Sequence, residues 1–448
     1  MDFDILPMLL VLAGSYFLIR LRFFFLLHPI GTLRRGLRVL KDKRAARSFF
    51  LALAGTLGVG NVFGVAFGIL IGGAGSLFWL VVSMLFAMVI KYCEVVLTSD
   101  NLSHDGETHG GFYYVISHSF KHLSRPLSAL YALTVLLLSL VMGAALQSDA
   151  VVETALTLGA IPRSYIAVVL LTLTLLAIVG GARKIETITA FIIPLSTIIY
   201  IFMTLSIIFV NLSALPLVFE DILSSALSID SVLGGGIGFL MLRPIKEGFA
   251  RGLLSNEAGA GTSAIAHARS GVLSPSSAGI LGILEVWFDT GVICVLTGLS
   301  ILVSVPDISA FSEGMELVMY SVGNLFGGFG KVVALLCVFA FAFATVICWY
   351  YYGSQSWCSL FGRRRRLIFL ALFLSAVFFG CFLDSILLVG ITDILMLTAT
   401  VLTLSALIKN SDRIRALSES GGLINLNVKR LRPYRFKGNV FSRAGKRR

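Results

Sequence analysis

The chain repeatedly contains apolar stretches of about 18 residues or more, each long enough to cross the hydrocarbon core of a bilayer. Its 448 residues are 57% hydrophobic and only 13% charged, whereas soluble domains carry about 25% charged residues. The apolar runs are continuous, unlike the alternating segments of about ten residues that mark transmembrane β-barrels. The sequence therefore predicts an all-α protein that crosses a membrane many times.

Eleven segments are predicted to span the membrane. They are residues 4–27, 49–72, 76–98, 126–154, 164–181, 188–212, 232–256, 278–304, 331–357, 366–383 and 387–408. The first lacks the basic leading region and the small-residue cleavage site of a secretory signal, so we expect it to be retained as a spanning helix.

The distribution of basic residues predicts how the chain is oriented. The loops on one side, together with the C-terminal tail, carry 28 Lys and Arg residues. The opposite loops carry Arg163 and, at the edge of a span, Lys331. The positive-inside rule then places the N-terminus outside and the tail in the cytoplasm, and we expect the bacterial inner (plasma) membrane. The net charge of +12 could indicate nucleic-acid binding. We instead expect the basic tail to be a solvated segment next to the anionic lipids of the membrane.

The ten spans that follow the first divide into two groups of five. The predicted units are an extra N-terminal helix with a basic loop (1–48), a first repeat (49–213), a second repeat (214–408) and a basic cytoplasmic tail (409–448). Because five is odd, the two repeats enter the bilayer from opposite faces. Each repeat opens on a glycine-rich stretch, 52–75 or 231–261, and the second is interrupted by Pro244. Such interruptions at matching positions of an inverted repeat are typical of a transporter's binding site.

The segment "TLGVGN", residues 56–61, is the predicted break of the first helix. A bilayer tolerates unwound backbone only where it is buried in protein or lines a cavity. The freed N–H groups can hold a carboxylate, and the freed carbonyls can hold a cation. The alternative for Gly60, Gly64 and Gly68, which are spaced by four, is a small-residue surface for helix packing.

Five segments together resemble the alanine or glycine:cation symporters, the sodium:alanine symporter family of the amino acid–polyamine–organocation superfamily. They are "ALAGTLGVGNVFGVA" (52–66), "KYCEVVL" (91–97), "GGFYYVI" (110–116), "RGLLSNEAGAGTSAIAHA" (251–268) and "FAFATVICWYYYG" (341–353). The resemblance implies a leucine-transporter-like five-plus-five inverted repeat with one extra N-terminal span. It also implies sodium-coupled uptake of alanine, glycine or a close relative.

The expected substrate site combines the first break with residues of two other spans. Gln147 is an amide deep in an apolar span and must find polar partners; the resemblance implies that it binds the ligand, and a neighbouring helix is the alternative. Thr345 and Trp349 share one helical face. Trp349 is expected to close the pocket, with an interfacial anchor as the alternative. The predicted substrate-binding residues are Thr56, Gly58, Val59, Gly60, Asn61, Gln147, Thr345 and Trp349.

Sodium binding requires about five or six oxygen ligands. By analogy with the implied fold, we expect the carbonyls of Gly55, Leu57 and Ala342 and the hydroxyl of Thr345. No organic cofactor is expected.

An inner gate is expected at Arg251, Asn256 and Glu257, which we place at the cytoplasmic end of the broken sixth helix of the repeats. Glu257 would pair with Arg251 and close the gate. Helix capping by Ser255 or Asn256 is the alternative.

Other charged residues in the apolar spans are functional candidates by default. Lys91 and Glu94 lie on one helical face and are expected to pair. Glu285 and Asp289 also share a face, and one of them is expected to be proton-linked or paired with Arg243 or Lys246. Asp149 stands where members of the family commonly carry asparagine, so an end-of-helix group and a cation or proton site both stay open.

The leading function is sodium-coupled symport of a small neutral amino acid by alternating access, in a protein that acts as a monomer in lipid. The alternatives are a proton-coupled permease and, with less support, a passive channel. The absence of paired carboxylates, a metal-binding His/Cys pattern and a Walker loop argues against an enzyme and against ATP-driven transport. Two departures from the family pattern, Phe112 for a proline and Ser354 for an acidic residue, leave the substrate range and coupling ion open.

Overall fold

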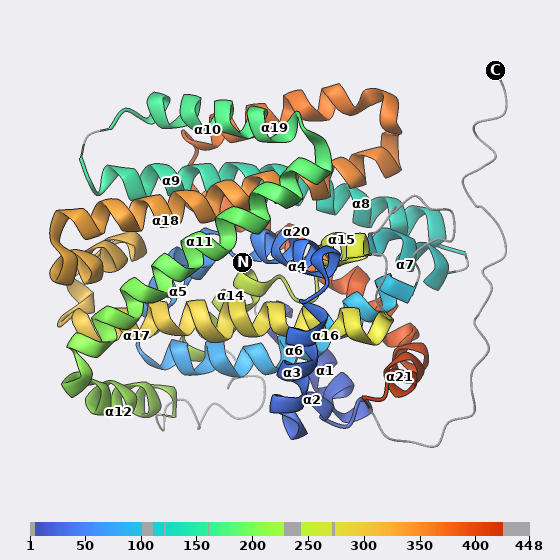
Figure 1. The fold of residues 1–448 in the computed structure, drawn as a ribbon, viewed down its shortest axis with the longest axis horizontal. Helices are drawn as coiled ribbons and strands as arrows, with labels where there is room; N and C mark the ends of the chain where they lie inside the picture. The colour runs from blue at the N-terminus through green and yellow to red at the C-terminus, as the bar shows by residue number, and fades with distance from the viewer. Residues whose placement is uncertain are drawn as a thin grey trace.

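A bundle of long helices forms the molecule (Figure 1). The computed structural model describes residues 5–100, 111–120, 122–159, 161–227, 243–270 and 274–423. Every regular element in these ranges is helical. Six of the helices are long and apolar enough to cross a membrane, and a bent pair of shorter helices would make a seventh span. The prediction of an all-α, polytopic membrane protein is therefore confirmed.

The described helices follow the predicted spans closely. The long ones are α6 (Gly75–Asp100), the continuous run Ser124–Leu156 (α8, η2 and α9), α11 (Gly181–Val210), the continuous run Pro275–Ser304 (α16, η6 and α17), α18 (Gly314–Phe361) and α20 (Ser385–Lys409). The shorter ones include α1 (Ile5–Arg20), α10 (Arg163–Ile178) and α19 (Arg366–Gly380). Eleven crossings stay a prediction, because length and composition identify fewer spans.

Three of the long helices are locally irregular. The run from α8 to α9 contains a π-helical turn, η2 (Val141–Ala145), and the run from α16 to α17 contains a second, η6 (Trp287–Cys294). Such turns are rare and often mark functional positions. In α18 the backbone kinks at Gly327, whose φ of 61° suits glycine.

The first broken helix consists of α4 (Lys43–Thr56), the short 3-10 helix η1 (Val59–Asn61) and α5 (Phe63–Gly72). The two arms are bent by 66° at the break. Leu57 and Gly58 have non-helical backbone angles, and both are buried. The predicted break in "TLGVGN" is therefore confirmed.

The second broken helix lies further along the chain than the sequence suggested. Its arms are α14 (Arg243–Asn256) and the short pair α15 (Ala264–His267) and η5 (Ala268–Ser270), joined by a buried loop, 257–263. Pro244 is in the first turn of α14, where proline is tolerated, so it does not interrupt the helix. The glycine run at 234–236 and the first part of the predicted span 232–256 lie outside the described residues.

The two broken helices run side by side in opposite directions through the middle of the bundle (Figure 1). A Cβ on Gly60 would lie 3.9 Å from Ser255, one on Gly68 would lie 3.0 Å from Arg251, and one on Gly72 would lie 3.0 Å from Glu247. At the other end, Ser48 of α4 donates a hydrogen bond to the Ala266 carbonyl of α15 (2.9 Å). Thus α5 packs along α14, and α4 packs beside α15. The glycines spaced by four form a packing surface next to the break.

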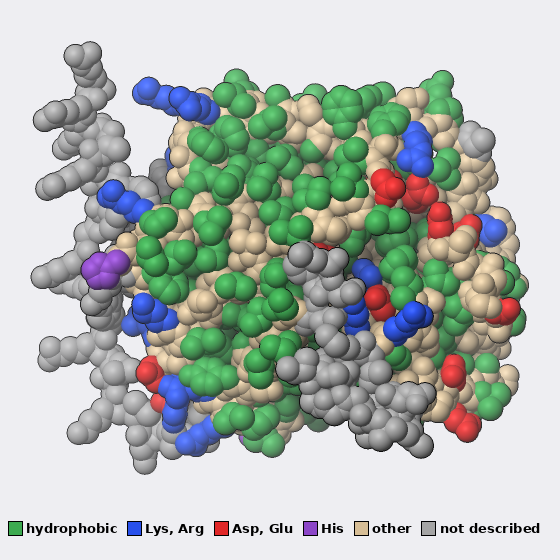
Figure 2. Space-filling model, turned by 180° about the vertical axis from the view of Figure 1, so that it is seen from behind, with side chains coloured by type: hydrophobic (Ala, Val, Ile, Leu, Met, Phe, Trp, Pro, Cys, Tyr) green, Lys and Arg blue, Asp and Glu red, His purple; other side chains and the backbone are tan. Residues whose placement is uncertain are grey.

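Several shorter helices accompany the long ones. They are α2 (Phe24–Leu27), α3 (Pro29–Val39), α7 (Phe112–Ser119), α12 (Leu215–Ala226) and α21 (Ser411–Ser420). In Figure 2 the middle of the visible face is mainly hydrophobic. Lys and Arg side chains lie toward both ends of this face, and most Asp and Glu side chains lie toward one of them.

Candidate functional site

The hydroxyl of Thr345 lies among the carbonyl groups of the first break. Its Oγ1 is 2.8 Å from the Ala54 carbonyl, 3.0 Å from the Phe341 carbonyl and 3.4 Å from the Leu57 carbonyl. One hydroxyl has a single proton to donate. The Thr345 hydroxyl therefore cannot fully satisfy all three carbonyl oxygens at once. A convergence of carbonyl and hydroxyl oxygens is the environment that hard cations prefer.

This oxygen cluster differs by one position from the expected sodium ligands. Thr345 and the Leu57 carbonyl come together as expected, but Ala54 and Phe341 contribute carbonyls where Gly55 and Ala342 were predicted. The Gly55 carbonyl instead accepts a hydrogen bond from Nε1 of Trp349 (3.3 Å). Ala342 is buried in the same helix, and nothing in the described contacts brings its carbonyl to Thr345.

Gln147 bonds directly to the backbone that the break sets free. Its Oε1 accepts a hydrogen bond from the Val59 N–H (3.1 Å), and its Nε2 donates to the Met142 carbonyl (3.3 Å). A Cβ on Gly58 would lie 2.8 Å from Gln147 Oε1 and 3.0 Å from Thr345 Oγ1. Glycine at position 58 therefore lets two polar side chains approach the unwound backbone.

Trp349 is completely buried, so it is not an interfacial anchor. Its indole lies beside the break, and it packs edge-on against Tyr352, with ring centroids 5.4 Å apart. On the other side is η2, where a Cβ on Gly143 would lie 2.2 Å from the Trp349 Cβ. The π-helical turn thus brings bare backbone against the tryptophan.

Gly143→Ala is expected to displace Trp349, because the added methyl group cannot fit beside its Cβ. Overpacking of this kind costs about 1–3 kcal/mol. We expect a lower thermal unfolding midpoint and a large loss of transport activity. Gly390→Ala is the matched control, because a Cβ there meets no atom within 4 Å. An unchanged unfolding midpoint in Gly143→Ala would show that Trp349 is not held by this contact.

Asp289, in η6, joins the two broken helices. Its Oδ1 accepts a hydrogen bond from Asn61 Nδ2 (2.5 Å), and its Oδ2 accepts from Ser255 Oγ (2.5 Å) and Thr290 Oγ1 (3.0 Å). The expected pairing of this carboxylate with Arg243 or Lys246 is therefore wrong for Asp289. Asn61 lies within the break, in η1, as expected, but its amide group donates a hydrogen bond to a carboxylate of the protein. Sequence spacing gave no sign of this contact, because a π-helical turn is not visible in an apolar run.

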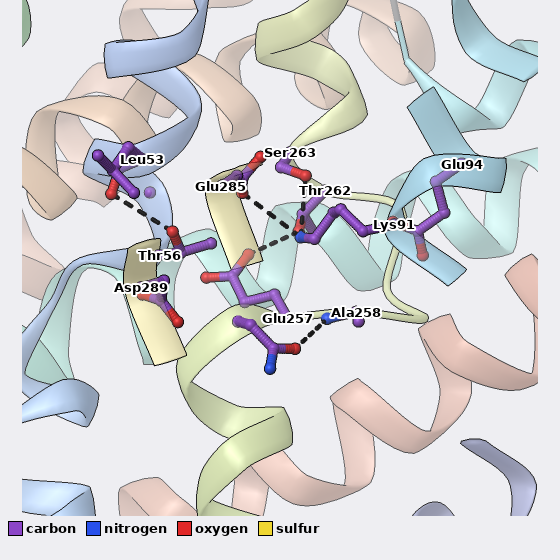
Figure 3. A network of polar contacts seen from close by, with 12 residues as sticks. Leu53, Thr56, Lys91, Glu94, Glu257, Ala258, Thr262, Ser263, Glu285 and Asp289 are labelled. Carbon is purple, nitrogen blue, oxygen red and sulfur yellow. Dashed lines mark hydrogen bonds and ion pairs between the residues drawn. The ribbon is translucent and has the colours of Figure 1, made fainter. Parts of the chain in front are cut away.

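The second break is held by charged residues of α6 and α16 (Figure 3). Glu94 Oε1 accepts hydrogen bonds from the N–H groups of Gly259 (2.7 Å) and Gly261 (3.1 Å). Lys91 Nζ donates to Ser263 Oγ (2.9 Å) and lies 3.5 Å from Glu285 Oε1. The predicted Lys91–Glu94 pair is therefore wrong. Both residues lie on one face of α6, but each binds a different part of the broken helix.

The proposed gate residues take separate partners. Arg251 pairs with Glu247 one turn away (3.0 Å), and its guanidinium lies 4.8 Å from the centre of the Phe67 ring. Glu257 instead accepts a hydrogen bond from Thr262 Oγ1 (2.6 Å). The expected Arg251–Glu257 pair is wrong because the two residues lie in different parts of the broken helix.

Asn256 and Glu257 lie at the centre of the second broken helix, where α14 ends. The Asn256 side chain accepts a hydrogen bond from the Ala258 N–H (3.0 Å) and donates to Thr290 Oγ1 (3.2 Å). Asn256 therefore orders the loop that follows α14, whereas the N-cap residue of α15 is Ser263, whose side chain makes no capping bond. Ser255 bonds to Asp289 instead.

Comparison with known proteins identifies the family of this chain. The sequence model of the sodium:alanine symporter family matches residues 1–418. The chain belongs to this family. It is therefore a transporter and not an enzyme, and the recognition based on sequence motifs is confirmed.

Three curated relatives of this symporter family are similar over most of the chain. An uncharacterized transporter of Haemophilus influenzae is 30% identical over 400 residues, 87% of each chain. The amino-acid carrier protein AlsT of Bacillus subtilis is 30% identical over 317 residues, 70% of this chain and 66% of the relative. The sodium/alanine symporter AgcS of Methanococcus maripaludis is 28% identical over 392 residues, 83% and 84% of the two chains.

Three residues that were expected to differ from the symporter family's pattern, Phe112, Ser354 and Asp149, lie in the described part of the structure. Phe112 packs on the second break, where a Cβ on Gly261 would lie 2.9 Å from its ring. Ser354 donates a hydrogen bond to the Tyr351 carbonyl within its own helix (2.9 Å). Asp149 is buried, accepts a hydrogen bond from Ser385 Oγ (2.5 Å) and lies 4.0 Å from Arg163 Nη1. The contacts of Asp149 satisfy its carboxylate within the protein.

Proposed function

We propose that this chain is a sodium-coupled symporter of alanine, glycine or a similar small neutral amino acid, working by alternating access. The observation that carries the proposal is the break at Leu57 and Gly58, where freed backbone groups meet Thr345, Gln147 and Trp349. The name of the relative AgcS, sodium/alanine symporter, points to the same pair of ligands. Membership of the family supports the mechanism.

The narrowness of the site favours a small amino acid. Gln147 and Thr345 approach the backbone at Gly58 so closely that a single added Cβ would meet both. Trp349 lies on the same side of the break, next to the bare backbone of Gly143. We infer that the zwitterion binds at the amides of the first break and that Trp349 limits the length of its side chain.

The oxygen cluster at Thr345 gives a physical basis for coupling to sodium. Its oxygens come from both sides of an interface, with Ala54 and Leu57 on the first broken helix and Phe341 and Thr345 on α18. A cation bound there would hold α18 against the break. Sodium and substrate would then stabilise the same arrangement, and each would raise the affinity of the other by the same factor.

The two antiparallel broken helices provide the parts of the protein that would move during alternating access. They support the proposed inverted repeat, because α5 with α14 forms one pair of arms and α4 with α15 forms the other. In our proposal the second pair lies on the cytoplasmic side and the N-terminus lies outside a bacterial plasma membrane, which the basic loop before α4 supports. Arg251, on α14, would then belong to the outer gate instead of the inner one. Asn256 and Glu257 would act at the centre, as the hinge of the second break.

Arg251→Met is expected to weaken closure of the outer arms, because it removes the positive charge that lies over the Phe67 ring of α5 but keeps an apolar stem beside Phe67 and Gly68. A contact between a cation and an aromatic ring contributes about 0.5–1 kcal/mol, so exchange of internal for external amino acid should change by roughly two- to fivefold. The measurement is counterflow of labelled alanine in proteoliposomes. Arg183→Met, at an exposed site on α11, is the control. Equal counterflow in both variants would exclude Arg251 from the gate.

Uptake by the purified protein in proteoliposomes tests the proposed function. Radiolabelled alanine and glycine are offered with a sodium gradient and a proton gradient imposed separately. We expect accumulation above the external concentration with the sodium gradient. Accumulation with a proton gradient alone would favour the proton-coupled alternative, and equilibration without accumulation would favour a channel. Lack of movement of either amino acid would refute the proposed substrates.

A further inference from the structure

The second break is surrounded by more negative than positive side chains. Four carboxylates gather there from α6, the loop after α14, α16 and η6. They are Glu94, Glu257, Glu285 and Asp289, and all are fully buried. Among the described residues, Lys91 is the lysine or arginine that faces them, and it is also fully buried (Figure 3). Buried charges without compensation are strongly destabilising, so this cluster needs a further positive charge.

The four carboxylates differ in what compensates them. Glu285 lies beside Lys91 Nζ and bonds to His267 Nε2 (2.7 Å). Asp289 accepts three side-chain hydrogen bonds, and Glu94 accepts two from backbone N–H groups. Glu257 accepts one, from the Thr262 hydroxyl. Its Oε1 is buried and has no hydrogen-bond partner among the described residues, so Glu257 is the least compensated of the four.

The other ionisable groups that face Glu257 supply no positive charge. Tyr131 of α8 donates its hydroxyl to the Ala260 carbonyl (2.7 Å). Cys348 and Tyr352 face Glu257 from α18. All three are weak acids that are neutral near pH 7. The Glu94 Oε2 atom also lacks a partner, but Oε1 of that residue accepts two backbone N–H groups, whereas the Glu257 carboxylate accepts one hydrogen bond.

The backbone at Glu257 is strained. Its φ is 53°, in the left-handed region that glutamate rarely adopts. Gly259 and Gly261, in the same loop, have φ of 93° and 71°, which glycine adopts freely. Strain of this kind at a non-glycine residue is often retained where it serves function. Here it holds a carboxyl group inside the break.

We propose that Glu257 is a proton-binding site, and that the proton it carries stabilises the second break in the arrangement seen here. This inference rests on the proposed transport function and adds a second coupled ion to it. The carboxylate takes one proton from water when the break is open and becomes a neutral carboxylic acid when the break closes. A metal ion is less suited to this position, because no group of three His, Cys, Asp or Glu side chains in the described part of the chain is arranged to hold one.

The direction of the pH effect follows from this assignment. A carboxyl group that binds its proton more tightly in the folded protein stabilises the fold at low pH. That stabilisation is lost as the pH rises through the value at which the folded protein releases the proton. The wild type should therefore lose stability on alkalinisation. Glu257→Gln, which mimics the protonated side chain, should lose less.

The first measurement is the thermal unfolding midpoint of the purified full-length protein between about pH 6 and about pH 9. We expect the difference between the unfolding midpoints, Glu257→Gln minus wild type at the same pH, to increase as the pH rises. Glu220→Gln, at an exposed site on α12, should follow the wild type throughout. A difference between Glu257→Gln and the wild type that is constant with pH would overturn the proposal. The proposal would also be overturned if, at a fixed pH, added sodium abolished the difference in unfolding midpoint between Glu257→Gln and the wild type. The ligand of Glu257 would then be a metal cation.

The second measurement is sodium-driven uptake of labelled alanine with the same pH on both sides of the vesicle. Wild-type uptake should fall by roughly tenfold for each pH unit above the transition, as expected for loss of one proton. Uptake by Glu257→Gln should be much less sensitive to pH, and an unchanged pH profile would count against the proposal. If neither the wild type nor Glu257→Gln transports alanine, the proposed substrate is wrong. The unfolding measurement still decides whether Glu257 holds a proton.

Discussion

Replacing Lys91 by methionine is expected to destabilise the folded protein by about 3–5 kcal/mol, the usual effect of removing one partner from a buried ion pair. Lys91 Nζ lies 3.5 Å from Glu285 Oε1 and donates to Ser263, and both charged side chains are fully buried. Methionine has a similar length, so it fills the space but leaves Glu285 without its lysine. The measurement is the free energy of unfolding of the purified protein in detergent.

A second variant separates the loss of charge from the loss of packing. Lys91→Met combined with Glu285→Gln removes both charges and keeps a group that can bond to His267. We expect this double variant to recover most of the lost stability. Lys184→Met, at an exposed site on α11, should be close to the wild type. If the double variant is as unstable as Lys91→Met, then packing of the lysine stem, and not its charge, holds this region.

The first break could be predicted from sequence because its signal is local. Glycines cluster around Thr56–Asn61 within an otherwise apolar stretch. Inside a membrane, unwound backbone is tolerated only where it is buried in protein or lines a cavity, so such a cluster indicates a binding site. For the second repeat, the sequence indicated the stretch 231–261 with an interruption at Pro244, but Pro244 begins α14 and the break in the described residues comes after Asn256. The helical arm before this break, Arg243–Asn256, contains charged residues and resembles the end of a span. Its charges are accommodated by pairing, as with Arg251 and Glu247.

The partners of charged side chains could not be predicted from spacing. Lys91 and Glu94 are three residues apart and share a helical face, which favours pairing in an isolated helix. In the folded protein, the N–H groups of Gly259 and Gly261 need acceptors, and Glu94 supplies one oxygen to both. Lys91 is then drawn to Glu285, which is distant in sequence. Buried polar groups are satisfied by tertiary contacts, and a single sequence does not encode these contacts in its periodicity.

The residues around the first break were identified more accurately, because the family resemblance supplied information that spacing lacks. Gln147, Thr345 and Trp349 all contact the break. The carbonyl groups differ by one position from those expected, at Ala54 and Phe341. A backbone carbonyl can be contributed by any residue type, so nothing in the sequence marks which one points at Thr345.

Thr345→Ala is expected to raise the sodium concentration required for half-maximal uptake by at least about tenfold, which corresponds to about 1.4 kcal/mol of binding free energy. The methyl group leaves the carbonyls of Ala54, Leu57 and Phe341 without the hydroxyl that completes their cluster. A contact between a polar group and a charge contributes about 1.5–3 kcal/mol, so the effect should be readily measured. The measurement is alanine uptake by proteoliposomes over a range of sodium concentrations.

Thr345→Ser separates the hydroxyl group from the methyl group. Serine keeps the oxygen, so we expect near-normal dependence on sodium, whereas Thr398→Ala, which removes an exposed hydroxyl from α20, should have no effect. Direct binding of sodium to detergent-solubilised protein, followed by protection against thermal unfolding, should weaken in the alanine variant alone. Unaltered sodium protection in Thr345→Ala would place the coupling cation elsewhere. The break at Leu57 and Gly58 would then serve the amino acid without the ion.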